Sequence, residues 1–218
     1  MYKIVYLNKG DKFSIVIKYT YPDDVGPYYT YIDKTVIIKS KRNPKGEKWI
    51  IKMFKGWKQQ GDDWYYFESS GAMATGWSKA GNYWYFFDEE GVMQTGWQEL
   101  GGVWYYLKSS GAMATAWEQV NGRWYYFDQN GHMMTGWLTL DSGKYYLSES
   151  GAMVTGWRIL DDSWYYFYEN GAMITGWLKV NDVWYFLDDE GVMVTGSKTI
   201  NGKAYEFASS GACTNPYI

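Results

Sequence analysis

Aromatic and apolar positions recur along this chain with a fixed spacing of 20 residues, from Trp57 to the C-terminus. The consensus is G-W-x6-W-Y-Y-F-x3-G-x-M-x-T, and eight copies follow one another without insertion or deletion. A strict period of this length indicates a solenoid, in which each copy packs on its neighbours. Seven copies open with tryptophan and the eighth with serine, at Trp57, Trp77, Trp97, Trp117, Trp137, Trp157, Trp177 and Ser197.

Within one copy, the pattern predicts two short strands and a loop. In the first copy, residues 56–60 and 64–67 predict strands, and the second of these consists of aromatic β-formers. The turn between them is Gly61-Asp62, and other copies have Asn121-Gly122 or Asn201-Gly202, which accept positive φ in hairpin turns. The glycine after the second strand, Gly71 in the first copy, recurs in every copy and marks a backbone position that a Cβ would strain.

The predicted fold class is all-β, a solenoid of stacked β-hairpins. A lone two-stranded hairpin is marginal in water, so the copies must stack to bury a core. The last copy has Ser197, Ala204 and Cys213 where the consensus has Trp, Trp and Met. Terminal repeats are commonly atypical because they cap the stack, so we expect this copy to be the cap.

The first 55 residues differ from the repeats in charge and pattern. Residues 1–55 contain 12 Lys/Arg and 5 Asp/Glu, whereas residues 56–218 contain 9 and 19. This contrast predicts two modules, a small basic domain of unknown role at 1–55 and the repeat domain at 56–218. Strand-like runs at 2–7, 12–19, 34–39 and 49–54 predict a small antiparallel β domain resting on the first repeat. Its positive charge fits either an acidic partner, such as a host surface molecule, or a solvated face.

Composition argues against catalysis, metal binding and membrane insertion. The chain has one His and one Cys, both outside residues 1–55. Asp23 and Asp24 are adjacent in a Pro/Gly turn, whereas paired acid–base carboxylates normally face each other across a cleft. We therefore expect no enzyme, no metal, no cofactor and no nucleic-acid partner. No stretch approaches 18 apolar residues, and no export signal is visible at Met1–Tyr6.

The aromatic residues, 21% of the chain, predict a binding surface. Side chains alternate along a strand, so Trp64 and Tyr66 share one face while Tyr65 and Phe67 share the other. A groove between successive hairpins would then be lined by Trp of one copy and the first Tyr of the next. Such a groove suits a quaternary ammonium, which has no hydrogen-bond donor to satisfy. Phe67, Tyr66 and Met73 are interpreted as core, but the tryptophans, whose N–H needs a partner, are not.

The repeat, with its two tryptophans and its G-x-M-x-T, resembles the choline-binding repeat of the choline-binding proteins over residues 56–216. These are surface proteins and lytic enzymes of bacteria whose teichoic acids carry phosphocholine. The resemblance implies a left-handed β-solenoid with choline between consecutive repeats, bound by two Trp of one repeat and the first Tyr of the next, often with a Met. The six implied sets are Trp57, Trp64 and Tyr85; Trp77, Trp84 and Tyr105; Trp97, Trp104 and Tyr125; Trp117, Trp124 and Tyr145; Trp157, Trp164 and Tyr185; and Trp177, Trp184 and Tyr205.

Two positions depart from this pattern. Lys144 stands where the second Trp of its copy should be, so the groove of Trp137, Lys144 and Tyr165 is predicted to be empty or weak. Ala116 replaces the glycine before Trp117, an exchange that we expect to be minor.

The implied function is non-enzymatic attachment to phosphocholine on teichoic and lipoteichoic acids, with choline as the ligand. The implied location is extracellular, bound non-covalently to the bacterial cell wall. One alternative is binding of glucan or host glycan, as in related toxin and glucosyltransferase repeats, which lack the paired Trp. Another is the cell-wall-targeting part of a lytic enzyme. The Trp pair is complete in six of the eight copies, which favours choline.

Overall fold

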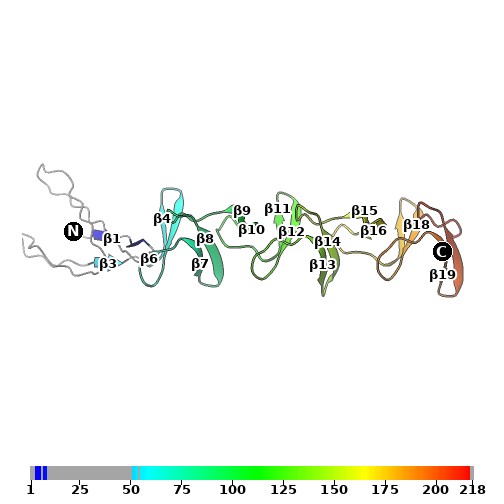
Figure 1. The fold of residues 1–218 in the computed structure, drawn as a ribbon, viewed down its shortest axis with the longest axis horizontal. Coiled ribbons are helices and arrows are strands. Elements are labelled where there is room, and N and C mark those ends of the chain that lie inside the picture. Colours follow the sequence, from blue (N-terminus) through cyan, green and yellow to red (C-terminus); the bar gives the residue numbers. More distant parts are fainter. Residues whose placement is uncertain (1–2, 6, 9–50, 54, 217–218) are drawn as a thin grey trace, which may run out of the picture. The chain divides into compact units, whose positions relative to one another are not determined.

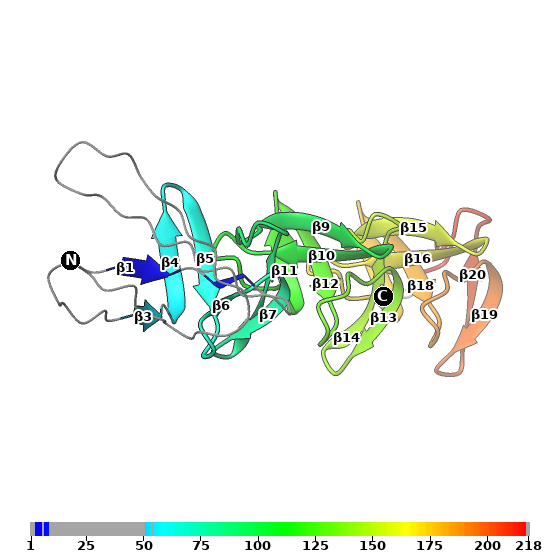
Figure 2. The same ribbon diagram turned by 60° about the vertical axis from the view of Figure 1, so that its left-hand side comes forward.

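The computed structural model describes residues 3–5, 7–8, 51–53 and 55–216. They fall into two compact units, Met1–Ala114 and Thr115–Ile218, which are described separately. Every regular element among the described residues is a β-strand (Figures 1 and 2). Within this part of the chain, no helix has the length and apolar character needed to cross a membrane.

The first unit contains three hairpins of the repeat. Each joins two antiparallel five-residue strands through a two-residue turn, as the sequence predicts. Across the first ladder, Trp57 lies opposite Tyr66 and Gln60 opposite Asp63. The pairs are β4 (Gly56–Gln60) with β5 (Asp63–Phe67), β7 (Gly76–Ala80) with β8 (Tyr83–Phe87), and β9 (Gly96–Leu100) with β10 (Val103–Leu107).

The second unit contains five hairpins with the same register. Its pairs are β11 (Ala116–Val120) with β12 (Arg123–Phe127), β13 (Gly136–Leu140) with β14 (Gly143–Leu147), β15 (Gly156–Leu160) with β16 (Ser163–Phe167), β17 (Gly176–Val180) with β18 (Val183–Leu187), and β19 (Gly196–Ile200) with β20 (Lys203–Phe207). The turn Asn121-Gly122 has φ values of 50° and 78°, as expected for a hairpin turn with two positive-φ residues.

A tight loop follows each second strand and contacts the preceding copy. In the second copy, the Val92 amide donates to Asp88 Oδ1 at 2.7 Å, which holds the loop closed. Gly91 in this loop has φ 80°, and a Cβ there would lie 2.6 Å from Cε of Met73 in the first copy. The fixed glycine is therefore needed both for its backbone conformation and for the close approach of a methionine.

Backbone hydrogen bonds also join consecutive copies within each unit. The amide at the Met position of one copy donates to the carbonyl at the second-Trp position of the copy before it. The bonds are Met93 to Trp64, Met113 to Trp84, Met153 to Trp124, Met173 to Lys144, Met193 to Trp164 and Cys213 to Trp184, all at 2.7–2.8 Å. Because these bonds use main-chain atoms, they persist where Lys144 replaces Trp and Cys213 replaces Met.

The core has one Phe or Leu from the second strand of each copy. Phe67, the first of them, is 1% exposed, which confirms its predicted core role. Burying a side chain of this size stabilises a fold by about 1.5–3 kcal/mol. The remaining members are Phe87, Leu107, Phe127, Leu147, Phe167, Leu187 and Phe207.

The N-terminal strands differ from the antiparallel pairing expected. β1 (Lys3–Val5) pairs in parallel with β3 (Ile51–Met53). β2 (Leu7–Asn8) pairs in parallel with β6 (Ala72–Met73) and extends the first repeat into a four-stranded sheet, β2-β6-β5-β4. Both pairings join segments distant along the chain, so no hairpin turn forces them to be antiparallel. The predicted strands at 12–19 and 34–39 and the Asp23-Asp24 turn lie outside the described residues.

Ala116 carries a backbone cost that the sequence reasoning underestimated. It has φ 60°, in the left-handed region that glycine occupies at Gly56, Gly76 and Gly96. For a residue with a Cβ this conformation costs roughly 1–2 kcal/mol.

Candidate functional site

The first predicted set brings three aromatic rings together from two consecutive copies. The indoles of Trp57 and Trp64 lie on one face of the first hairpin, with centroids 6.3 Å apart and planes at 79°. Tyr85 of the next hairpin lies 4.6 Å from Trp57 at 70°. The steep angles between these planes make three ring walls around one region of the surface.

Strand alternation positions these rings, as predicted. Trp57 packs on Tyr66, its cross-strand partner, at 5.0 Å. Tyr85 and Phe87 both approach Trp57, at 4.6 and 5.9 Å, because they point to the same side of their strand. Burial raises the pKa of the Tyr85 phenol above its ordinary value, with a smaller contribution from Tyr83. The phenol is therefore protonated at neutral pH, and its ring is uncharged.

The contact between the first Trp and the Tyr of the next copy recurs in four of the other five sets. The first Trp of each lies 4.8–5.1 Å from the predicted Tyr of the next copy. These pairs are Trp77 with Tyr105, Trp117 with Tyr145, Trp157 with Tyr185, and Trp177 with Tyr205. In the third set, Trp97 and Trp104 lie 6.1 Å apart in the first unit. Tyr125 belongs to the second unit, so the assembly of this set stays a prediction.

In the second, third, fourth and sixth copies the two tryptophans differ in exposure, whereas in the first copy Trp57 is as exposed as Trp64. The second is exposed, with 39% of Trp64 and 41% of Trp164 accessible to solvent. The first has a partial core role, since Trp157 packs against the buried cluster of Ile174, Leu178 and Leu187. The expectation that neither tryptophan fills the core thus holds for the second and is incomplete for the first. The reason is that the first Trp reaches the Phe or Leu of the next copy as well as its Tyr.

Within each unit, the backbone amide at the Met position (Cys213 in the last copy) bonds to the carbonyl at the second-Trp position of the copy before it. The Met153 amide donates to the Trp124 carbonyl at 2.7 Å, and Met153 and Trp124 line one hollow. Met153 thus lies beside Trp124, and its part in a choline site stays a prediction.

Tyrosine burial separates the fourth and sixth sets from the rest. Tyr145 is 7% exposed and packs with Leu138 and Leu147, while its hydroxyl donates to Ser142 Oγ at 3.0 Å. Tyr205 is similarly buried, in the last copy. In the fourth set, Tyr145 is thus held in the core, and the accessible aromatic surface comes mainly from Trp124.

Lys144 places an ammonium group in the groove that was predicted to be weak. Its Nζ lies 4.5 Å from the ring centroid of Trp137, and Trp137 lies 5.1 Å from Tyr165. The chain's own cation thus occupies the ring face that an external cation would use. This geometry supports the prediction, which stays untested, that the groove does not bind a second cation.

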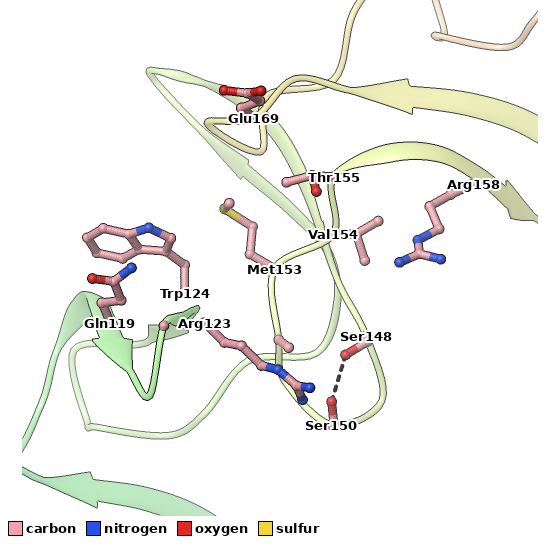
Figure 3. Close-up of a pocket in the computed structure, with 12 residues that line it drawn as sticks. Gln119, Arg123, Trp124, Ser148, Ser150, Met153, Val154, Thr155, Arg158 and Glu169 are labelled. Carbon is pink, nitrogen blue, oxygen red and sulfur yellow. Dashed lines mark hydrogen bonds between the residues drawn. The ribbon is translucent and has the colours of Figure 1, made fainter.

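A hollow of about 610 Å³ adjoins Trp124 and Met153 in the second unit (Figure 3). Arg123, Arg158 and Ser148 are among the residues that line it. The sequence reasoning missed this hollow because its walls come from three different copies. Within the described part of the chain, no group of three or more His, Cys, Asp or Glu side chains could hold a metal ion.

Comparison with known proteins gives a family match and structural relatives. The family model described as choline-binding repeat matches residues 54–90, 74–116, 114–155 and 154–196. The structure of CbpJ from Streptococcus pneumoniae TIGR4 is 35% identical, with a TM-score of 0.71, covering 91% of this chain and 70% of that one.

Two further structures are similar, both from Streptococcus pneumoniae. Choline binding protein F, in crystal form II, is 33% identical with a TM-score of 0.71, covering 99% of this chain and 71% of that one. The choline-binding domain of CbpL is 28% identical with a TM-score of 0.54, covering 74% and 87%. A search of curated protein sequences gave no match.

Proposed function

Because the chain belongs to the choline-binding repeat family, we propose that it binds choline in aromatic cages between consecutive copies. An aromatic cage here means one set of two Trp and the Tyr of the next copy. The ligand is the phosphocholine of teichoic and lipoteichoic acids, and binding holds the protein non-covalently on the bacterial cell surface. The repeats act by binding, without catalysis.

The periodic, exposed second tryptophan is the observation that carries this proposal. Trp64, Trp84, Trp104, Trp124 and Trp164 each leave about two-fifths of their surface in water. Large rings exposed at a regular spacing are unfavourable unless a ligand covers them. Each of them lies three positions before the buried Phe or Leu of its strand and, because side chains alternate, points to the opposite face, so folding alone does not require an indole there.

Choline fits this surface chemically. Its trimethylammonium carries positive charge but no hydrogen-bond donor, and the faces of aromatic rings carry negative potential. The repeat domain is also acidic, with 19 Asp/Glu against 9 Lys/Arg in residues 56–218. Long-range attraction therefore favours a cation over an anion at most of the cages.

The expected affinity of one cage is low. A desolvated cation–π contact contributes ~2 kcal/mol or less, so a few rings leave about 4 kcal/mol after the entropy of capture. This corresponds to a Kd on the order of 1 mM. Stable attachment then requires several cages on one polymer, which can raise avidity by ~10²–10⁴.

A choline titration of the full chain tests the proposal. Tryptophan fluorescence should change saturably in the millimolar range, and choline at ten times Kd should stabilise the fold by about 1.4 kcal/mol per cage. The uncharged isostere 3,3-dimethylbutanol is the control, because it has the same shape without the charge. An equal response to both compounds, or none to choline, would contradict a cation-binding cage.

A further inference from the structure

The hollow beside Trp124 contains an unusual concentration of positive charge. Residues 56–218 contain only two arginines, Arg123 and Arg158, and both line this hollow. They come from the fourth and sixth copies, 35 positions apart in the chain. Within the part of the chain that the structure describes, neither guanidinium makes an ion pair or a hydrogen bond. Two arginines without an ion pair, lining one hollow of an otherwise acidic domain, are a recognition feature that folding does not explain.

The orientation of these side chains gives the hollow a polar end and an aromatic end. Figure 3 shows the guanidinium groups of Arg123 and Arg158 directed toward the loop that carries Ser148 and Ser150. The two serine hydroxyls lie 2.9 Å apart. Trp124 and Met153 form the aromatic end, where Met153 points toward the indole.

We infer that the fourth cage has a phosphate-binding subsite, in which Arg123 and Arg158 hold the phosphate of a phosphocholine. This inference rests on the proposed function, because the ammonium of the same phosphocholine would lie against Trp124. In that ligand a two-carbon link joins the two groups, so one molecule carries both the cation for Trp124 and the anion for the arginines.

Arginine is the side chain suited to this role. Its planar guanidinium presents N–H donors in a fork that matches two oxygens of a phosphate. Ser148 or Ser150 supplies a hydroxyl donor to a third oxygen. Glu169 also lines the hollow and opposes an anion, but Figure 3 shows it at the end away from the serine loop. The balance there is two guanidinium groups against one carboxylate.

The first cage provides a control within the same molecule. The positions that correspond to Arg123 and Arg158 in the repeat are Asp63 and Gln98 there. That cage has the corresponding Trp–Tyr contact and an equally exposed second Trp, but a carboxylate and an amide in place of the arginines. It should therefore bind phosphocholine no more tightly than choline.

The test is a titration of the full chain by NMR, with separate choline, phosphocholine and inorganic phosphate series. The indole N–H signals of Trp64 and Trp124, assigned with single Trp→Phe variants, report on the two cages separately. At Trp124, phosphocholine should bind about three- to tenfold more tightly than choline, and this preference should fall with added salt. At Trp64, no such preference should appear.

The double variant Arg123→Gln/Arg158→Gln should remove the preference at Trp124 and leave its choline affinity within about twofold. Both arginines are exposed, so the fold should be kept, and an unchanged Tm checks this. Arg158→Lys, which keeps the charge but loses the fork, should retain only part of the preference.

Equal phosphocholine-to-choline ratios at both cages, or a preference that survives the double variant, would overturn the phosphate subsite. Inorganic phosphate that binds the arginines as tightly as phosphocholine does would also overturn it, since the cage would then contribute nothing. If choline shifts neither indole signal, the proposed function fails and the subsite falls with it. If choline binds but the phosphocholine-to-choline affinity ratio is the same at Trp64 and Trp124, the phosphate subsite is ruled out and the proposed function stands.

Discussion

At the scale of single residues, the two tryptophans of the sixth copy differ in burial. Trp157 packs on the buried cluster of Ile174, Leu178 and Leu187, whereas Trp164, 6.2 Å from it, is 41% exposed. The core therefore requires the first tryptophan of this copy but not the second.

This difference predicts unequal losses of stability for two matched substitutions. Trp164→Ala should lower the free energy of unfolding by about 1 kcal/mol or less, because little buried surface is lost. Trp157→Ala should lower it by about 3 kcal/mol, as for a large core side chain. Calorimetric titration should show one choline site fewer in each variant. A large loss of stability in Trp164→Ala would mean that this ring is core.

The recurring glycine gives a second residue-scale prediction. Gly191 and Gly176 have φ values of 82° and 83°, but a Cβ would meet Met173 Cε at 2.6 Å at Gly191 and nothing within 4 Å at Gly176. Gly176→Ala should therefore cost about 1–2 kcal/mol for the backbone alone. Gly191→Ala should cost about 1 kcal/mol more, because Met173 must move from its packed position. Denaturant unfolding of both variants compares the two costs, and equal values would rule out the methionine contact.

At the scale of the hairpin, the sequence was sufficient to predict strands, turns and faces. The reason is that the alternation within W-Y-Y-F and the turn residues such as Asn121-Gly122 are local, and variants of both recur along the eight copies. The family resemblance and the alternation of side chains along a strand predicted that Trp157 and Tyr185 are adjacent. Their ring centroids lie 4.9 Å apart.

Other features depended on contacts that no local pattern contains. Tyr145 is buried, and its hydroxyl donates a hydrogen bond to Oγ of Ser142 in the turn of the same hairpin. Arg123 and Arg158 line one hollow because three copies pack together. The parallel pairing of β1 with β3 joins segments far apart in the chain. Such long-range contacts are set by packing and are not visible as periodicity.

The hairpin of β13 and β14 gives an element-scale prediction. Lys144 keeps the backbone bond from the Met173 amide to its carbonyl while its Nζ covers Trp137. Lys144→Trp should therefore create one additional choline cage, with a Kd on the order of 1 mM, because the ring is added to a hairpin that is already in place. Calorimetric titration of the full chain should show the added site.

Lys144→Met is the matched control, since it removes the ammonium without adding an aromatic ring. It should leave the number of choline sites unchanged or restore only weak binding through Trp137 and Tyr165. No additional site in Lys144→Trp, in a variant with unchanged Tm, would contradict the cage geometry proposed for all copies.

At the scale of the whole molecule, the proposed attachment depends on many weak cages acting on one polymer. We expect the full chain to bind a choline-bearing polymer ~10²–10⁴ times more tightly than free choline. Free choline at several times its Kd should release the protein from the polymer, as measured by co-sedimentation. Sodium chloride at the same ionic strength should release much less, because cation–π contacts with a bound ammonium are less exposed to screening than surface ion pairs. Equal release by both salts would indicate attachment by charge alone.

The backbone bond between consecutive copies also has a consequence for how this protein changes over generations. Because that bond requires no particular side chain, we expect an in-frame duplication of one 20-residue copy to form the same bonds on both sides and, under the proposed function, to add one cage. Lys144 at a second-Trp position keeps the backbone bond while its ammonium covers Trp137. Copy number and single substitutions are therefore two routes by which we expect the proposed attachment to change in small steps while the hairpins keep their backbone pairing.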